Sequence, residues 1–156
     1  FVTKVKKSVS LPVLQKDFVI DPIQIYQARE IGSDALLLIA RLVSEKQLKE
    51  FVSLCFFLGI EPVVEINDEE DLAKAVAANP RIIAVNARDL RTFDVSVDRA
   101  CDLLRHIPDR FVRLGFSGVS GHQEVKQYRE AGAVGVLIGT SLMESSDVRG
   151  FIKEIL

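Results

Sequence analysis

The segment Arg81-Ile-Ile-Ala-Val-Asn86 is a short apolar run that closes on a polar residue. Five other segments have the same form: 11–16, 35–41, 62–65, 111–117 and 134–140. A helical pattern follows each run, and the centres of successive runs lie about 20 to 30 residues apart, which is room for a strand, a helix and two loops. Strands that alternate with helices in this way predict an α/β fold with a parallel sheet and right-handed crossovers.

The ends of the runs distinguish two parallel architectures. Six βα units alone are compatible with an open, flavodoxin-like sheet or with part of a closed (β/α)8 TIM barrel, which has eight units. Four of the polar residues that close these runs are candidates for chemistry: Lys16, Glu65, Asn86 and Ser117. Because the strand ends of a barrel meet at one face, chemistry at four strand ends favours a partial TIM barrel of about six βα units.

Capping residues mark the helices between these runs. Asp21-Pro22 opens a helix that ends before Gly32, and Ser44 opens one that ends before Gly59. The remaining helices are expected to begin near Asp68, at Ser96 or Asp98, near His122 and at Asp147. Residues 1–9 have the pattern of the second half of an amphipathic helix, so we expect a further segment upstream. No linker interrupts the series, and 1–156 is predicted to be a single domain.

Composition and charge argue against several classes of protein. The chain has 156 residues, of which 48% are hydrophobic, and this is enough for a buried core. The net charge of −2 and the pI of about 5.7 do not suggest a nucleic-acid partner. Because the sequence has neither an apolar stretch of about 20 residues nor a signal peptide, we expect no membrane association and a cytoplasmic location.

The cysteines and histidines predict neither a disulfide nor a metal site. Cys55 and Cys101, the only cysteines, each lie in an apolar helical pattern and are expected to be reduced core thiols. His106 and His122 have no metal-ligand partners at a workable spacing, and the glycine motifs of nucleotide-binding loops are missing.

Lys16 and Glu65 are candidates for proton transfer. Burial near a barrel mouth would lower the pKa of Lys16 and make it an acid or an electrostatic polariser, although an exposed loop lysine is the simpler interpretation. Glu65 ends an apolar run, and burial would raise its pKa toward the range useful for proton transfer. The alternative for Glu65 is a structural ion pair, with Lys16 as the possible partner.

Asn86, Arg88 and two glycine-containing segments are candidates for substrate binding. Asn86 can hold a hydroxyl and Arg88 can bind a carboxylate through two hydrogen bonds, whereas the alternative for 86–89 is a turn closed by the asparagine side chain. Ser117-Gly118 and Gly139-Thr140-Ser141 follow the last two runs. Small residues there let backbone amides approach an anion, and the loops after the last two strands of such barrels frequently bind phosphate.

Four segments resemble the indole-3-glycerol-phosphate synthase family. They are 12–26, 64–68, 85–93 and 136–143, and they occur in the family's order along essentially the whole chain. The first resembles the third strand and following helix of that family. The resemblance implies a (β/α)8 barrel that closes the indole ring of 1-(2-carboxyphenylamino)-1-deoxyribulose 5-phosphate with loss of CO2 and water. It also implies that neither a metal nor an organic cofactor is used.

The resemblance implies a role for each candidate residue. Lys16 would assist attack of the aromatic ring on the ketose carbon, and Glu65 would act in acid–base steps of the dehydration. Asn86 and Arg88 would contact substrate, and Phe18 would form a wall of the anthranilate pocket. The implied phosphate cradle comprises Gly118, Gly139 and Thr140, with Ser117 nearby. The implied catalytic residues are thus Lys16, Glu65, Asn86 and Ser117, and the substrate-binding residues Phe18, Arg88, Gly118, Gly139 and Thr140.

Two departures from the family keep an alternative open. The family's first-strand Glu-x-Lys and Ser-Pro motifs are missing, so the chain is expected to carry strands 3 to 8 without the first two βα units. Phe116 stands where the family usually has glutamate, and its ring would fill substrate space unless Arg113 shifts the strand. The alternative is therefore an inactive truncated or engineered fragment that keeps only the phosphate-binding scaffold, with open barrel edges that favour self-association. A different phosphosugar enzyme, such as a ketose isomerase, fits Lys16 and Glu65 less well.

Overall fold

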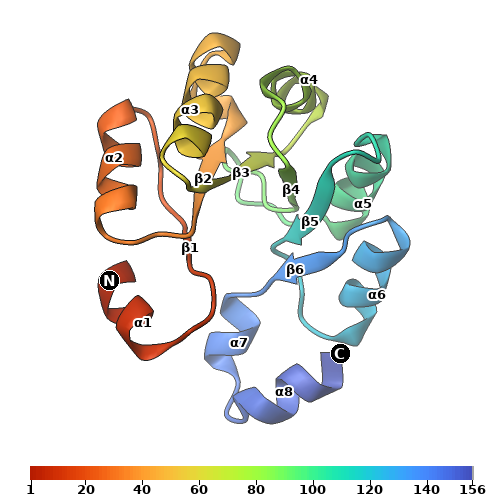
Figure 1. Ribbon diagram of the computed structural model, residues 1–156. Coiled ribbons are helices and arrows are strands. Elements are labelled where there is room, and N and C mark those ends of the chain that lie inside the picture. The colour runs from red at the N-terminus through yellow and green to blue at the C-terminus, as the bar shows by residue number, and fades with distance from the viewer. Residues whose placement is uncertain (156) are drawn as a thin grey trace. The chain divides into compact units, whose positions relative to one another are not determined.

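The computed structural model describes residues 1–155 (Figure 1). The chain divides into two compact units, Phe1–Ile83 and the residues from Ala84 onward. The first unit contains α1 (Val2–Ser8), β1 (Leu14–Gln15), α2 (Pro22–Glu30), β2 (Ala35–Ile39), the 3-10 helix η1 (Ala40–Leu42), α3 (Glu45–Phe57), β3 (Glu61–Ile66) and α4 (Glu69–Ala78). Strand β4 (Ile82–Asn86) spans the boundary. The second unit continues with α5 (Val97–His106), β5 (Val112–Phe116), α6 (His122–Glu130), β6 (Gly135–Leu137), α7 (Thr140–Glu144) and α8 (Val148–Ile155).

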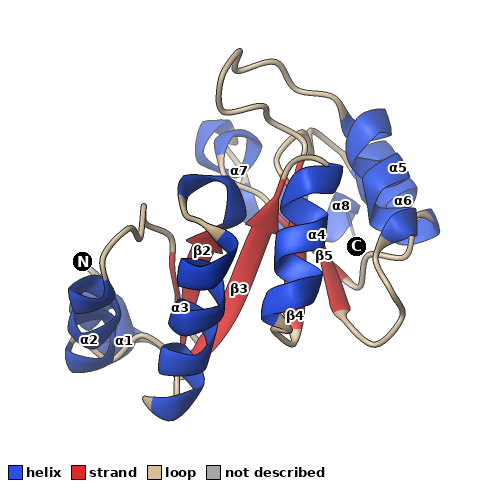
Figure 2. Cartoon of the chain, turned by 90° about the horizontal axis from the view of Figure 1, so that it is seen from above, coloured by secondary structure: helices blue, strands red, loops and turns tan. Residues whose placement is uncertain are grey.

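In the first unit, β1, β2 and β3 are parallel neighbours in that order. The register places Leu14 beside Ala35 and Ile39 beside Glu65. Helix α3 packs against β2 and β3, and α3 and α4 lie side by side (Figure 2). Leu36, Leu37 and Leu38 are all buried. Because successive residues of a strand face opposite sides, β2 is covered on both faces, as its apolar run predicts.

In the second unit, β5 pairs in parallel with β6, and Phe116 lies beside Leu137. The amide of Ala87, just after β4, donates to the carbonyl oxygen of Phe116 at 2.8 Å. Helices α5 and α6 lie side by side, and α6 also contacts β6 and α8 (Figure 1). Leu104, Phe116 and Tyr128 are buried in this unit. These contacts fix the ends of β4, β5 and β6, and therefore position the loops that follow these strands.

The predicted helix starts are confirmed by the capping bonds. Asp21 and Ser44 each form a reciprocal capping box with the residue three positions on, and Asp68 accepts the amide of Asp71. Of the two starts proposed for the next helix, Ser96 is the N-cap, because its hydroxyl accepts the amide of Arg99. Each bond satisfies one of the backbone amides that a helix start leaves without a carbonyl partner.

Two predicted strand runs are only partly strand, and two short helices were not predicted. The run 11–16 forms a strand only at Leu14–Gln15. Pro12 has no N–H, and the amide of Val13 donates to the Asp34 carboxylate at 2.6 Å instead of to a strand. The run 134–140 stops at Leu137 as a strand because α7 begins at Thr140. Helices α7 and η1 were not predicted, since elements of five and three residues are too short to show a helical period.

Both cysteines are free and buried, as expected. Burial raises the pKa of the Cys55 thiol to about 12, with a smaller contribution from the nearby Glu61 carboxylate. Helices long and apolar enough to cross a membrane are not found among residues 1–155.

Candidate active site

Lys16 and Glu65 form an ion pair within the first unit. Lys16 follows β1, Glu65 lies near the end of β3, and Nζ stands 3.1 Å from Oε2. The Glu65 side chain is 3% exposed, whereas that of Lys16 is 44% exposed. The pair therefore places a screened carboxylate beside an ammonium group that solvent can reach. This contact is compatible with both interpretations of Glu65, because a structural ion pair and a proton-transfer pair would use the same two groups.

Phe18 projects from the loop between β1 and α2. Its side chain is exposed, while its backbone is held from both sides: the amide donates to Asp17 Oδ1 at 2.8 Å, and the carbonyl accepts from Gln24 Nε2 at 2.9 Å. Gln24 belongs to the capping box of α2. The helix start thus fixes the loop and presents the aromatic ring to solvent.

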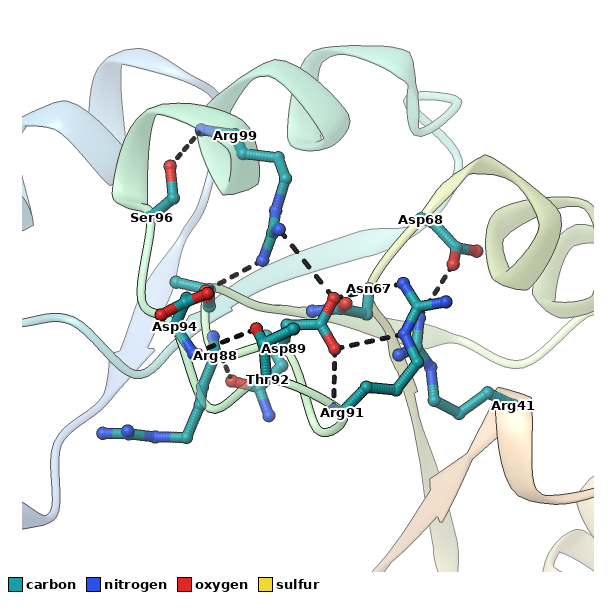
Figure 3. Close-up of polar contacts among 12 residues, drawn as sticks. Arg41, Asn67, Asp68, Arg88, Asp89, Arg91, Thr92, Asp94, Ser96 and Arg99 are labelled. Atoms are coloured by element: carbon teal, nitrogen blue, oxygen red, sulfur yellow. Dashed lines mark hydrogen bonds and ion pairs between the residues drawn. The ribbon is translucent and has the colours of Figure 1, made fainter.

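A polar cluster around Arg41 lies beyond the ends of β2 and β3 and was not predicted. Arg41 donates from Nη2 to Asp68 at 2.8 Å (Figure 3). It also donates from Nε to Asp71 at 3.1 Å. The amide of Asn67 also donates to Asp71. Burial raises the pKa of Asp71, and the Arg41 charge opposes this shift. A sequence signal existed, because Asp71 lies four residues before the apolar Ala75 and so shares its helix face.

In the second unit, the end of β4 folds into the turn considered as an alternative for 86–89. Asn86 Oδ1 accepts the amide of Arg88 at 3.0 Å, which is the bond of an asparagine-closed turn. Arg88 then donates from Nη1 to the carbonyl of Phe93 at 3.2 Å, and an isolated antiparallel bridge joins Arg88 to Val95. The loop that follows β4 is therefore folded back on itself around Arg88.

Asp89 anchors the same loop. Its carboxylate side chain is 7% exposed and forms ion pairs with Arg91 at 3.2 Å and Arg99 at 4.0 Å (Figure 3). Arg99 also donates to the carbonyl of Ala87 at 3.2 Å. The buried carboxylate and its cations fix the loop to the start of α5.

One cavity of about 320 Å³ in the second unit gathers five of the predicted residues. They come from three loops, those after β4, β5 and β6, and they are Arg88, Ser117, Gly118, Gly139 and Thr140. Val95 and Ser120, which were not predicted, also line it. Arginine, hydroxyl groups and glycine-containing backbone are the donors that a small anion such as phosphate requires.

The backbone of the loop after β5 is left-handed at two successive residues. Ser117 has φ +68° and Gly118 has φ +76°. Glycine accepts this conformation readily, whereas a residue with a Cβ does not. At Gly118 a Cβ would also lie 2.7 Å from Val97 Cγ2. Position 118 therefore requires glycine for both its conformation and its packing.

Phe116 points away from the helix α6. A Cβ on Gly115 would run into the Tyr128 ring of α6, so Gly115 faces that helix and Phe116, one residue on, faces the opposite side of the sheet. Phe116 is 2% exposed and stays in regular register with Leu137 of β6. Among the described residues, those lining the 320 Å³ cavity do not include Phe116, so its ring leaves that cavity open. Groups of three or more possible metal-ligating side chains do not occur in the described part of the chain.

Comparison with known proteins identifies the family to which the chain is related. The family model for indole-3-glycerol phosphate synthase matches residues 1–155. The chain is 39% identical over 155 residues to the indole-3-glycerol phosphate synthase of Lachnoclostridium phytofermentans, covering 99% of this chain and 57% of that protein. It is 38% identical over 144 residues to a multifunctional tryptophan biosynthesis protein of Schizosaccharomyces pombe, covering 92% of this chain and 19% of that protein. The chain therefore spans well under two thirds of the length of these relatives.

Solved structures share the fold at low sequence identity. The 3-hexulose-6-phosphate synthase of Salmonella typhimurium has a TM-score of 0.82 at 16% identity, over 99% of this chain and 76% of its own. The tryptophan synthase A-subunit of Pyrococcus furiosus has a TM-score of 0.73 at 18% identity, over 99% and 70%. The prediction of a TIM-barrel fold with six βα units is confirmed by these similarities. By the family match and the identity of its relatives, the chain belongs to the indole-3-glycerol phosphate synthase family.

Proposed function

We propose that the protein is a carboxy-lyase of tryptophan biosynthesis that makes indole-3-glycerol phosphate from 1-(2-carboxyphenylamino)-1-deoxyribulose 5-phosphate. In this proposal, residues 1–156 form a single domain that corresponds to strands 3 to 8 of the barrel. Family membership supports the reaction class. The observation that carries the proposal is the convergence of Arg88, Ser117, Gly118, Gly139 and Thr140 on one cavity.

The reaction requires two kinds of proton transfer. The ring carbon that bears the carboxylate attacks the ketose carbonyl carbon, and the carbonyl oxygen takes up a proton. CO2 then leaves, and the electron pair of the broken bond restores the aromatic ring. Finally the new hydroxyl group leaves as water after protonation, and the adjacent carbon loses a proton. The enzyme therefore needs a proton donor near the carbonyl oxygen and an acid–base group for the dehydration.

Lys16 and Glu65 fit these two tasks. The ammonium group of Lys16 can donate a proton to the carbonyl oxygen, and its 44% exposure leaves it accessible to an incoming molecule. Glu65 is screened from solvent and can exchange a proton with Lys16 across the 3.1 Å contact. In this proposal Glu65 serves the dehydration, Asn86 holds a substrate hydroxyl group and Phe18 borders the aromatic ring.

The cavity in the second unit would hold the phosphate. Arg88 supplies a permanent positive charge, and the loops around Ser117-Gly118 and Gly139-Thr140 supply hydroxyl groups and backbone amides. Proteins commonly bind phosphate with such glycine-containing loops because the backbone can approach the oxygens closely. In this proposal Ser117 stands at the edge of the phosphate cradle, with no metal ion and no organic cofactor.

A second candidate function is that of a phosphate-binding scaffold without turnover. Phe116 favours it, because a buried apolar ring stands at the position where the related enzymes, by the resemblance described above, usually have a carboxylate. Without that carboxylate, Lys16 would lack one partner of opposite charge, whereas the cavity formed by the loops after β5 and β6 would remain intact.

The fluorescence of the indole product distinguishes the two candidates. Turnover of the carboxyphenylamino substrate by the protein, lost in Glu65→Gln and kept in Glu61→Gln, would support the carboxy-lyase. Glu61 is the matched control because it lies on the same strand and also pairs with a cation, Arg81, at 2.9 Å. Phosphate binding without turnover would support the scaffold. Failure to bind either molecule would contradict both.

The remaining assignments follow from this reaction. The partner is a phosphorylated small molecule, not a nucleic acid or a membrane, and the location is the cytoplasm. Self-association is proposed through strand edges: among the described strands of its own unit, β1 pairs only with β2 and β6 only with β5, and the other edge of each is the proposed contact with a second chain. Analytical ultracentrifugation tests this, and a monomer at all concentrations would contradict it.

A further inference from the structure

The ring of Tyr128 lies directly on the backbone of β5. Tyr128 belongs to α6 and is fully buried. At Gly115 a Cβ would lie 2.7 Å from Tyr128 Cγ and closer still to two other ring carbons. No residue with a side chain fits beneath the ring, so Gly115 allows Tyr128 to approach the strand.

The approach carries the Tyr128 hydroxyl group to the end of β5. The hydroxyl lies 2.9 Å from the carbonyl oxygen of Ser117 and 3.2 Å from that of Phe116, and can donate to both. The Phe116 carbonyl also accepts the amide of Ala87. Burial raises the pKa of the Tyr128 hydroxyl above its usual range, so the group keeps its proton and remains a donor.

The bonded carbonyl groups flank the left-handed backbone of Ser117. A residue with a Cβ adopts this conformation at a cost, so the surrounding structure must hold it there. The hydroxyl of Tyr128 fixes the carbonyl on either side of the Ser117 Cα. From this point the chain enters Gly118 and the cavity, whose described lining does not include Tyr128.

We propose that Tyr128 is a positioning residue of the anion site: its hydroxyl holds Ser117 in the left-handed conformation that turns the Ser117-Gly118 segment toward the bound phosphate. This inference rests on the proposed function in one respect, namely that the cavity holds the phosphate group. Tyr128 itself does not touch the ligand in this arrangement.

The test compares Tyr128→Phe with Tyr26→Phe, using inorganic phosphate as the probe and calorimetric titration as the measurement. Tyr26 is the matched control because it is the other tyrosine and is half-exposed on α2. Loss of the hydroxyl group that bonds both carbonyl oxygens is expected to raise the phosphate Kd about five- to tenfold in Tyr128→Phe. Tyr26→Phe should bind phosphate as the unaltered protein does. Equal phosphate affinity of Tyr128→Phe and the unaltered protein would overturn the inference.

A second comparison separates positioning from general support of the fold. Glycine adopts the left-handed conformation without a Cβ penalty, so in a Ser117→Gly background the additional change Tyr128→Phe should alter the phosphate Kd less than about twofold. A purely structural role would instead give the same loss in both backgrounds. That equal loss would overturn the inference.

The amide NMR signals of Ser117 and Gly118, recorded without phosphate, separate this inference from the proposed function. Signals that move in Tyr128→Phe and stay in Tyr26→Phe support the conformational role even if phosphate fails to bind. In that case the proposed phosphate site would be rejected, whereas the conformational role of Tyr128 would stand. Signals that stay in place in Tyr128→Phe overturn the inference whatever the affinity for phosphate.

Discussion

The ammonium group of Lys16 lies 3.1 Å from the carboxylate of Glu65, although the two residues are 49 positions apart. Parallel pairing of β1, β2 and β3 produces this contact, because it aligns the ends of all three strands. The positive charge of Lys16 after β1 is therefore paired with the negative charge of Glu65 near the end of β3.

Glu65→Gln tests whether this pair transfers protons. The amide keeps the shape of the carboxylate but cannot accept a proton, so we expect kcat to fall about 10²- to 10⁴-fold. Because Lys16 remains half in solvent, the melting temperature should change little. Steady-state kinetics and thermal melts of Glu65→Gln and of the control Glu61→Gln provide the comparison. An unchanged kcat would assign the pair to structure alone.

Arg88→Gln tests the charge in the cavity. A charged hydrogen bond to an anion contributes about 1.5–3 kcal/mol, so the variant should bind inorganic phosphate about 10- to 100-fold more weakly. Arg149→Gln, an exposed arginine on α8, is the matched control. If both variants lose affinity equally, the effect reflects net charge and not the site.

Ser141→Ala tests how the two glycine-containing loops are joined. The Ser141 hydroxyl donates to the carbonyl of Val119 at 2.7 Å and so links the loop after β6 to the loop after β5. Without this bond we expect the KM of the phosphorylated substrate to rise about fivefold while kcat is kept. Ser146→Ala, at an exposed position, should leave both constants unchanged. A fall in kcat with constant KM would contradict the prediction.

Phe116→Glu tests the environment at the end of β5. The Phe116 side chain is buried, and a carboxylate there would lose its hydration, so the variant should be less stable by several kcal/mol. Phe116→Leu, which keeps the site apolar, should be milder. Urea unfolding of the two variants measures the difference. Equal stability of the glutamate and leucine variants would mean that the site accommodates charge.

Asp34 predicts a pH dependence of stability. The hydrogen bond from Lys6 at 2.7 Å, followed by that from the Val13 amide, holds the pKa of Asp34 below its ordinary value of 3.8. Because the folded pKa is lower than the unfolded one, the stabilisation is present above pH 3.8 and is lost as the pH falls through the folded pKa.

Thermal melts between about pH 2 and pH 6 test this dependence. Asp34→Asn should melt below the unaltered protein near neutral pH, and the two curves should converge in acid. Glu30→Gln, at an exposed position on α2, serves as the control and should follow the unaltered protein. A gap that stays constant down to the lowest pH would contradict the prediction.

The sequence predicted those parts of the fold that have a strong local cause. Ser44 and Asp68 cap helices because their side chains satisfy amides three residues away, and that spacing is visible in the sequence. The extent of the strand in the run 11–16 was predicted wrongly, because the amide of Val13 donates to the side chain of Asp34, which is distant in the chain. Local periodicity carries no information about such a partner.

The residues of the candidate site likewise include some that the sequence indicated and others that it did not. Glycines and polar residues at strand ends indicated the residues that line the cavity, since strand direction alone brings them together. Neither Val95 nor the Arg41 cluster could be found by that rule. Val95 reaches the cavity through the folded loop after β4. The Arg41 cluster belongs to the first unit and depends on the contacts of Arg41 with Asp68 and Asp71, which are distant in the chain.

The contact between Gly115 and Tyr128 constrains the order in which this protein can change. While the tyrosine ring covers the strand, every substitution at position 115 meets a steric clash. A smaller residue at position 128 would remove that clash and open position 115 to alanine or serine. Descendants of this sequence can therefore vary at position 115 only after position 128 has changed, so the present pair restricts its own evolutionary paths.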